Sequence, residues 1–428
     1  MEPLPEALGL IEFTDASPSP YHACATAAAM LQSRGFERLS ERQSWPAGGN
    51  RLIVRGGTLI AWSAPEGVAA GSGMRMVGAH TDSPNLRIRP RPERQQLGYR
   101  QLAVDVYGGA LVNSWLDRDL GISGRVVVET GSGPEVRLLR MDRALLRVAQ
   151  LAPHLDRDLR AEGLHLNAQT QVVPILGMAA ENGPDFLDLM ASDLGVGKES
   201  ITSWDLMTHD LAPGRLAGQS NEFVSSARLD NLGCSYAATR AMIGGVGSDT
   251  GAHRISILCL FDHEEVGSTS STGASGGMLP ATLERITLAL GWTREDFLRS
   301  MSQSTLVSAD MGHAVHPDYQ DHYEPGHLLH LNQGPAIKVN ANQRYATDAV
   351  GGALFVACCR DASVPWQHYL SRADIPCGST IGPMLSARLG VTTVDVGFAQ
   401  LAMHSARELC GAQDVSAMVR ALTAFLGS

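Results

Sequence analysis

Short apolar runs alternate with amphipathic segments along the chain, and this alternation predicts its secondary structure. Apolar side chains recur at helical spacing in residues 7–34 and are interrupted by the Ser-Pro-Ser-Pro run at 17–20, so we expect one or two helices there. Compact apolar or alternating runs predict strands at residues 52–54, 58–62, 74–79, 124–129, 135–139, 254–261, 305–309, 336–339 and 391–396. Helical spacing predicts further helices at residues 230–242, 281–303, 346–358, 382–388 and 398–426.

The order of these elements predicts an α/β protein made of two domains. Strands and helices alternate in the C-terminal half, which indicates a doubly wound, mostly parallel sheet with helices on both faces. Residues 87–227 break this pattern with a Pro- and Arg-rich start, a strand-rich part and a polar stretch at 153–171 that has no clear periodicity. We therefore predict a discontinuous domain formed by residues 1–86 and 228–428, interrupted by an inserted β-rich domain of residues 87–227.

Composition and charge narrow the class of protein. Of the 428 residues, 44% are hydrophobic and 18% are charged, which is ordinary for a globular protein in water. The formal charge of −10 argues against nucleic acid or an anionic membrane as the main partner, and no apolar run approaches the ~18–20 residues of a membrane span. The seven cysteines are scattered and include no CxxC pair, which indicates reduced thiols and a cytoplasmic location. Any metal must then be bound by histidines and carboxylates.

Glu264 and Glu265 come shortly after the apolar run 255–261, separated from it by Asp262 and His263, and this pair is the first candidate for chemistry. One carboxylate can bind a metal while the other takes the proton of a water bound to that metal. A Glu-Glu pair alone is more often a solvated turn. Other polar residues, however, stand at strand ends, at a helix start or on the last helical segment, and these are His80, Asp310, Asp230 and His404. Together they would suit two zinc ions that share one carboxylate.

Asp82 follows His80 by two residues. Its carboxylate could accept a hydrogen bond from the second imidazole nitrogen and so fix the tautomer of a metal-binding histidine. A lone aspartate at a strand end is more often a cap or turn residue. The joint placement of these residues makes the metal site the better interpretation.

Six short motifs, in consistent order, resemble the M18 family of metallo-aminopeptidases, the aspartyl aminopeptidases. They are AHTDSP at 79–84, RLDN at 228–231, FDHEEVGS at 261–268, SADM at 308–311, NANQRY at 340–345 and MHS at 403–405. The resemblance implies one zinc site formed by His80, Asp230 and Asp310, and a second formed by Asp230, Glu265 and His404. It also implies Glu264 as the general base, a zinc-exopeptidase fold interrupted by a dimerisation domain, and a homo-oligomer of dimers in the form of a tetrahedral dodecamer.

The resemblance assigns roles to three further residues. Lys338 by itself would be taken for a surface lysine, but with Tyr345 it is expected to contact the side chain of the substrate. His154 stands in a Pro-His-Leu motif similar to the element that passes from one subunit into the active site of its neighbour. There it could hydrogen-bond the substrate or the developing oxyanion, and direct zinc binding is a weaker option. Without the resemblance, an exposed loop histidine would be the simpler interpretation.

Three other segments carry weaker signals. The Gly/Ser-rich residues 267–277 lack the Lys-Ser/Thr ending of a phosphate loop, so a flexible loop is expected. Five histidines between residues 313 and 330 have no acidic or thiol framework, which favours a mobile or interface segment over a metal site. The backbone N–H groups of residues 378–382 could bind a carbonyl oxygen or a carboxylate.

These features predict a di-zinc aminopeptidase that removes an N-terminal residue from peptides and prefers Asp or Glu; other divalent metals are possible. A related di-metal exopeptidase or deacylase with neutral substrates is the alternative among enzymes. Outside enzymes, the alternative is an idle assembly that binds its metals structurally. Glu264 argues against that last option, because a structural metal site needs no additional carboxylate that is not a ligand.

Overall fold

The structure, a computed structural model, describes residues 5–157, 159–179, 183–245 and 254–428. The contacts divide the chain into two compact units, each described by itself below. The first unit comprises Met1–Asp82, Gly214–Met403 and Glu408–Ser428, and the second comprises Ser83–Pro213 and His404–Arg407. The chain therefore changes unit at 82/83 and 213/214, whereas the sequence pattern places the boundaries at 86/87 and 227/228.

A nine-stranded sheet forms the centre of the first unit, in the order β1-β2-β3-β13-β4-β14-β18-β16-β17. Its central strands β13, β4, β14 and β18 run parallel, while β3 and β16 join them in antiparallel pairs. Every residue of β4 is buried, as expected for a strand covered on both faces. The strands are β1 (Glu37–Arg38), β2 (Gly49–Arg55), β3 (Thr58–Ala64), β4 (Arg75–His80), β13 (Ser256–Phe261), β14 (Thr305–Ala309), β16 (Ala336–Lys338), β17 (Gln367–Tyr369) and β18 (Thr392–Gly397). The predicted α/β class with a largely parallel sheet is confirmed.

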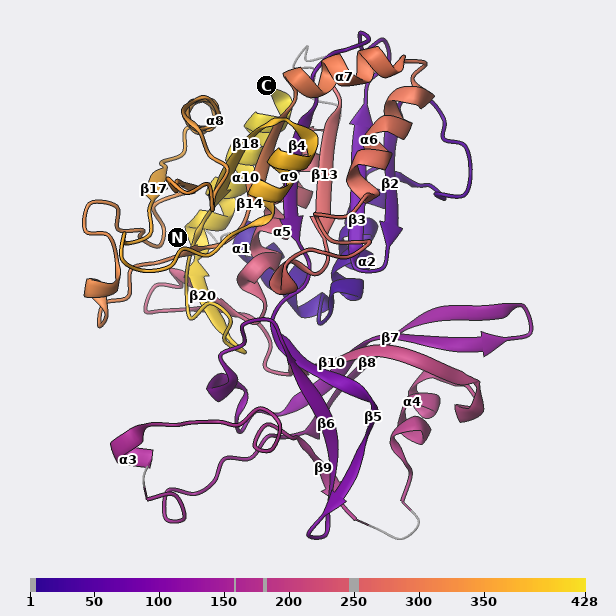
Figure 1. Ribbon diagram of the computed structural model, residues 1–428, viewed down its shortest axis with the longest axis vertical. Helices are drawn as coiled ribbons and strands as arrows, with labels where there is room; N and C mark the ends of the chain where they lie inside the picture. Colours follow the sequence, from indigo (N-terminus) through magenta and orange to yellow (C-terminus); the bar gives the residue numbers. More distant parts are fainter. Residues whose placement is uncertain (1–4, 158, 180–182, 246–253) are drawn as a thin grey trace. The chain divides into compact units, whose positions relative to one another are not determined.

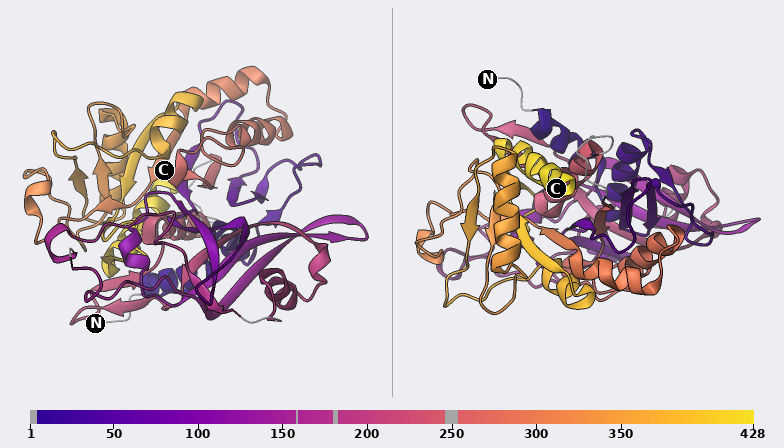
Figure 2. Two further views of the ribbon diagram at one scale, coloured as in Figure 1. Left: turned by 60° about the horizontal axis from the view of Figure 1, so that its bottom comes forward. Right: turned by 90° about the horizontal axis from the view of Figure 1, so that it is seen from above.

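Helices cover both faces of this sheet (Figures 1 and 2). One apolar core joins α1, α2, α5, α8 and α10 to the sheet, and a second core joins α6, α7 and α9 to it. The helices are α1 (Pro5–Ala16), α2 (Pro20–Gln32), α5 (Leu229–Gly245), α6 (Met278–Ala289), α7 (Arg294–Gln303), α8 (Ala349–Asp361), α9 (Ile381–Leu389) and α10 (Ala412–Gly427). Two short 3-10 turns, η3 (Glu264–Val266) and η4 (Gln320–His322), also belong to this unit.

The single helix predicted at 281–303 is in fact two helices. Gly291 has a φ of 78°, which a residue with a side chain adopts only under strain, and it follows the end of α6. Thr293 then begins α7 with a capping box, because its hydroxyl accepts the N–H of Asp296 while the Asp296 carboxylate accepts the N–H of Thr293. The glycine that ends α6 and the capping box that begins α7 therefore outweigh the apolar spacing, which continues across both helices.

The helix predicted at 398–426 is wrong over its first part. Residues 398–411 contain β19 (Ala399–Leu401) and β20 (Glu408–Gly411), and only α10 is helical. These strands belong to a five-stranded sheet in the order β11-β12-β20-β19-β15, with β11 (Arg215–Ala217), β12 (Phe223–Ser226) and β15 (Gly312–His313). Pairing with distant strands, which a single sequence does not reveal, overrides the helical spacing here. His404 therefore lies in the loop between β19 and β20, with a φ of 67°, and not on a helix.

The second unit contains a six-stranded antiparallel sheet in the order β8-β7-β10-β5-β6-β9. Phe186 and Met190 of α4 pack into its apolar core together with Leu120 and Leu206 from the strands. The elements are β5 (Asn85–Gln96), β6 (Tyr99–Tyr107), η1 (Val112–Trp115), β7 (Leu120–Thr130), β8 (Gly133–Leu146), α3 (Leu159–Glu162), β9 (Ile175–Met178), α4 (Phe186–Leu194), η2 (Lys198–Ser200) and β10 (Ile201–Asp210). The unit is β-rich as predicted, and the expected hairpin is formed by β7 and β8.

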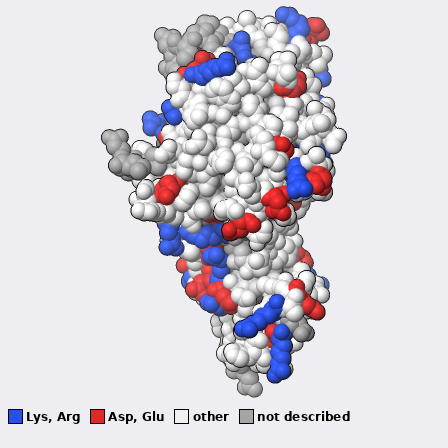
Figure 3. Space-filling model, turned by 90° about the vertical axis from the view of Figure 1, so that its left-hand side faces the viewer, with Lys and Arg blue, Asp and Glu red and all other residues white. Residues whose placement is uncertain are grey.

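The cysteines and the surface charges of the structure agree with what the composition indicates. All seven cysteines are free, and only Cys377 is not buried. Within the described ranges, no helix has the length and apolar character needed to cross a bilayer. Figure 3 shows acidic and basic side chains intermixed on one face rather than gathered by sign.

Asp414 leads to a prediction about stability and pH. This buried carboxylate in the first turn of α10 accepts the N–H groups of Asn332 at 2.6 Å and Gly334 at 2.8 Å. Burial raises the pKa of Asp414 to about 7, although both N–H donors oppose the rise. An unfolded aspartate titrates near ~3.9, so between about pH 4 and 7 the folded chain binds more protons and its stability falls as the pH rises.

Replacing Asp414 by Asn should remove this contribution. The difference in melting temperature between Asp414→Asn and the parent protein is then expected to shift in favour of the variant as the pH increases from about 4 to 7. Thermal unfolding at several pH values measures it. A difference that stays constant over this window would show that the carboxyl titrates alike in the folded and unfolded chains.

Candidate active site

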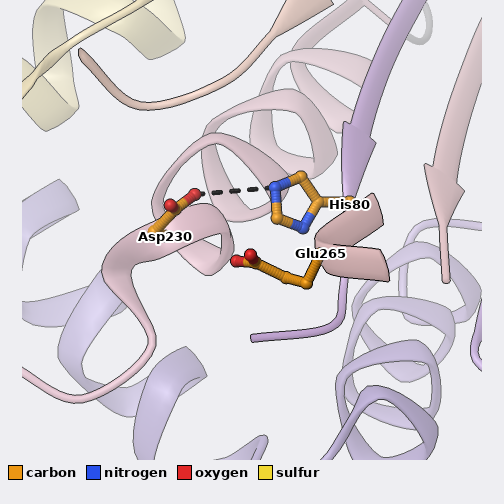
Figure 4. A group of neighbouring side chains, drawn as sticks. All are labelled: His80, Asp230 and Glu265. Atoms are coloured by element: carbon orange, nitrogen blue, oxygen red, sulfur yellow. Dashed lines mark ion pairs between the residues drawn. The ribbon is translucent and has the colours of Figure 1, made fainter. Parts of the chain in front are cut away.

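Three potential metal ligands converge in the first unit, and they are His80, Asp230 and Glu265. His80 ends β4, Asp230 stands in the first turn of α5, and Glu265 lies in the 3-10 turn that follows β13. Each offers a ligand atom, and these atoms all lie within 4.8 Å of one another (Figure 4). One imidazole nitrogen and two carboxylates are donors that zinc prefers, so the donor set fits a divalent metal.

Asp310 belongs to the same group. Strands β13, β4 and β14 are neighbours and run parallel, so the residues at their carboxyl ends meet at one edge of the sheet. Asp310 follows β14, and its Oδ1 atom lies 3.6 Å from His80 Nε2. Its backbone N–H donates to Val396, while a Cβ at Gly397 would lie only 1.7 Å from the carbonyl oxygen of Asp310. Only glycine at 397 allows this close approach, which fixes the backbone that carries Asp310.

The start of α5 is tied to both neighbouring strand ends. Ser235 donates its hydroxyl to the carbonyl oxygen of His80 at 2.7 Å, and Asn231 donates its side-chain N–H to Ala309 at 2.8 Å. Asp230 and Asn231 themselves have non-helical backbone angles. These two bonds hold Asp230 close to His80 and Asp310. The positioning roles of Ser235 and Asn231 were not predicted, because a small polar residue near a helix start has no distinguishing signal in one sequence.

Asp82 orders both the histidine and the glutamate pair. His80 Nδ1 lies 3.0 Å from the main-chain oxygen of Asp82, which can only accept, so Nδ1 carries the proton and Nε2 faces the carboxylates. The carboxylate of Asp82 lies further from Nδ1, at 3.4 Å. Its two oxygens instead accept the N–H groups of Glu264 at 3.0 Å and Glu265 at 3.1 Å. Asp82 thus holds the turn that presents both glutamates.

Glu264 lies beside the ligand group, with its Oε2 atom 3.9 Å from His80 Nε2. Burial raises the pKa of Glu264 to about 8, assisted by Asp310, Asp82 and Asp230 and opposed by His80. Burial also disfavours protonation of His80, yet the nearby carboxylates of Asp230, Asp310 and Asp82 outweigh it and raise the pKa of His80 well above its usual value. The cluster therefore has a strong demand for positive charge. A divalent cation would meet that demand and displace the proton.

Lys338 is not a surface residue, because it is buried at the end of β16. Its Nζ atom donates to the carbonyl oxygen of Met311 at 2.7 Å and lies 3.6 Å from Asp310 Oδ2. Burial lowers the pKa of Lys338, but the carboxylates of Asp310 and Asp395 outweigh burial and raise it above its usual value. The ring of Tyr345 lies 5.4 Å from Nζ. The two residues predicted to contact the substrate are therefore neighbours, and the lysine is a charged group.

The remaining two predicted residues belong to the second unit. His404 Nδ1 lies 3.1 Å from the carbonyl oxygen of Gly109, so Nδ1 carries the proton. His154 is exposed in the loop before α3. The role of His404 as a zinc ligand and the role of His154 in a neighbouring subunit stay predictions.

In the structure, two histidines of residues 313–330 and a backbone N–H group near residues 378–382 make contacts with residues close to them in the chain. His316 packs against the ring of Tyr319 with 4.9 Å between centroids, and His327 contacts Glu324. Near residues 378–382, the N–H of Gly382 already donates to the hydroxyl of Thr380, which is the N-cap of α9. That N–H group is therefore already engaged by the chain.

Comparisons with known proteins agree with this geometry. Residues 13–426 match the family described as "Aminopeptidase I zinc metalloprotease (M18)". The chain is 50% identical to a probable M18 family aminopeptidase 2 of Mycobacterium leprae, over 99% of this chain and 98% of that one. A solved structure of a complex of Ape4 and Nbr1 superposes with a TM-score of 0.95 at 38% identity, over 99% of this chain and 85% of that one. The S. cerevisiae mApe1 dodecamer gives a TM-score of 0.85 at 28% identity, over 98% and 95%.

Proposed function

The chain belongs to the M18 family of zinc aminopeptidases, and we propose that it uses two zinc ions to remove an N-terminal Asp or Glu from peptides. One observation carries the mechanism. The Asp82 carboxylate binds the N–H groups of both Glu264 and Glu265, so a candidate ligand and a second carboxylate stand side by side. A metal that only stabilises a fold needs no such second carboxylate, whereas hydrolysis needs a base beside the ligands.

The proposed ligands divide into two sets that share Asp230. His80, Asp230 and Asp310 would hold one ion, and Asp230, Glu265 and His404 the other. When bound, the ions would polarise the scissile carbonyl and lower the pKa of a water. Zinc follows from the family and from the nitrogen and oxygen donors, while other divalent metals remain compatible with the same donors.

Glu264 is proposed to move the proton. Its half-buried carboxylate would take the proton of the attacking water and then pass it to the leaving amine. Asp82 would keep the base in place through the backbone of Glu264.

Lys338 and Tyr345 are proposed to select an acidic first residue. A buried ammonium group is a suitable partner for a carboxylate, because a low-dielectric surrounding strengthens their attraction. The ring of Tyr345 would form a wall of the same subsite. A neutral subsite would instead favour apolar residues, and such a preference is the main alternative.

We also propose a cytoplasmic homo-oligomer, a tetrahedral dodecamer built from dimers, in which the second unit provides the dimer contact. The free cysteines suit a reducing compartment. The similarity to the mApe1 dodecamer supports the assembly, and the exposed position of His154 suits a residue that reaches a neighbouring subunit.

The function is tested by metal analysis and a panel of aminoacyl substrates, each assayed with and without a strong chelator. About two ions per chain and chelator-sensitive cleavage, fastest after Asp or Glu, are expected. Full activity in metal-free protein would exclude the mechanism. Equal or faster cleavage after Leu or Ala would exclude the acidic preference while leaving the peptidase function intact.

His154 gives a prediction about shared active sites. His154→Ala should lower activity without altering stability or oligomer size, and mixing it with Glu264→Gln subunits should restore part of the rate. The rescue is expected because some mixed interfaces pair an intact base with an intact loop. Steady-state assays of the mixture, after subunit exchange has been demonstrated, measure it.

His165→Ala is a matched control for this experiment. His165 lies in the same polar stretch, and its Nε2 atom is 2.9 Å from the carbonyl oxygen of Glu162, so it has a local partner. The His165→Ala variant should have the same peptidase rate as the parent protein. Exchange without any recovery of activity would show that His154 does not act across subunits.

A further inference from the structure

A buried carboxylate outside the proposed ligand set contacts the backbone of Asp230. Glu408, the first residue of β20, is 2% exposed, and its Oε2 atom accepts the N–H of Asp230 at 2.9 Å. We infer that Glu408 is a positioning residue that fixes Asp230 and thereby sets the affinity of the metal centre. The inference rests on the proposed function only in taking Asp230 as the carboxylate shared by both ions.

The need for Glu408 follows from where Asp230 stands in its helix. The first N–H groups of a helix have no partner within the helix and normally bond to the side chain of a capping residue. Asp230 lies in the first turn of α5, and its side chain points toward His80 and Glu265 (Figure 4). The side chain of Asp230 therefore belongs to the ligand group. The acceptor for the backbone N–H of Asp230 is the side chain of Glu408 in β20.

The sheet brings Glu408 to this place. Strand β20 pairs with β12, and Glu408 lies opposite Ser226, directly before the chain turns from β12 into α5. The other side of that turn is also held, because the Arg228 guanidinium donates to the carbonyl oxygens of Thr14 and Ser17 at 3.0 and 3.1 Å. The segment that carries Asp230 is thus fixed from α1 and from β20.

The carboxyl group of Glu408 is the informative feature. A single N–H could be accepted by a neutral oxygen, and burying a carboxylate costs free energy unless a compensating interaction exists. A charged acceptor makes a hydrogen bond roughly twice as strong as a neutral one. When ionised, Glu408 also adds negative charge behind Asp230, whose carboxylate faces His80 together with that of Asp310. Both effects favour a bound divalent metal and a fixed orientation of Asp230.

The test compares Glu408→Ala and Glu408→Gln with a matched control, Asp414→Ala. Asp414 is likewise a fully buried carboxylate that accepts main-chain N–H groups, but its partners Asn332 and Gly334 lie outside the ligand set. Zinc affinity is measured by competition with a chelator, and the visible absorption spectrum of the cobalt-substituted protein reports ligand geometry. Thermal unfolding of each metal-free protein reports stability.

Glu408→Ala should lower the affinity of at least one ion by about 10- to 100-fold and change the cobalt spectrum, as is usual when a partner behind a ligand is lost. Glu408→Gln should show a smaller loss, because its amide oxygen can still accept the N–H. Asp414→Ala should alter stability alone. Parental affinity and spectrum in Glu408→Gln and Glu408→Ala, or in the Gln variant if the Ala variant does not fold, would overturn the inference.

The outcome is independent of the peptidase assay. If the parent protein binds metal but cleaves no peptide, the proposed function fails, while the comparison of metal affinities still decides the role of Glu408. If peptides are cleaved and the variants bind metal as the parent does, the function stands and the inference fails.

Discussion

Glu264→Gln is expected to keep its metal and to lose about 10²- to 10⁴-fold in kcat, because it removes proton transfer without removing a ligand. Glu265→Gln is expected to lose metal as well as activity, because its carboxylate belongs to the ligand group. Both substitutions preserve the backbone N–H groups that bind Asp82, so the turn should keep its shape. Metal content after gel filtration, followed by steady-state kinetics, measures both effects.

Glu284→Gln, a glutamate of α6 that pairs with Arg294 outside the cluster, is the control and should change neither quantity. If Glu264→Gln loses metal while Glu265→Gln keeps it and is inactive, the two roles are reversed. If Glu264→Gln retains full activity, another group transfers the proton.

Lys338→Ala should reduce kcat/KM for Asp and Glu substrates by about 30-fold or more relative to Ala or Leu substrates. This corresponds to the ~2 kcal/mol that the loss of one partner of a buried charge pair usually costs. The net charge of −10 repels acidic peptides at long range, but salt screens that repulsion over ~8 Å, so a nearby ammonium group determines the preference. Parallel assays with Asp, Glu, Ala and Leu substrates measure the ratio.

The position of Lys338 also suggests an alternative role for this lysine. Its Nζ atom lies 3.6 Å from Asp310 Oδ2, so the lysine could serve Asp310 rather than the substrate. An equal loss on all four substrates, accompanied by lower metal content, would assign it to that role. Lys198→Ala, which removes a half-exposed lysine paired with Asp185 and Asp188 in the second unit, should leave the ratio unchanged.

The sequence predicts those site residues whose position depends on the residues next to them in the chain. His80 and Glu264 each come at or shortly after the end of a mostly apolar run, and such runs indicate buried parallel strands whose carboxyl ends meet. His404 shows the opposite case. The spacing of its segment suits a helix, but pairing of β19 and β20 with strands far away in the chain decides its conformation. The burial of Lys338 and the contact from Glu408 likewise arise from residues distant in sequence, which no local pattern reports.

The segment His404–Arg407 belongs to the second unit, although the residues on either side of it belong to the first. The carbonyl oxygen of His404 accepts the N–H of Leu111, its Nδ1 atom contacts Gly109, and the N–H of Ala406 donates to Ser114. A shortened chain that joined Asp82 directly to Gly214 would delete all three partners. The insertion is therefore not a detachable module, and a minimal peptidase made by excising it should lose the ordered conformation of this histidine loop even if its large sheet still forms.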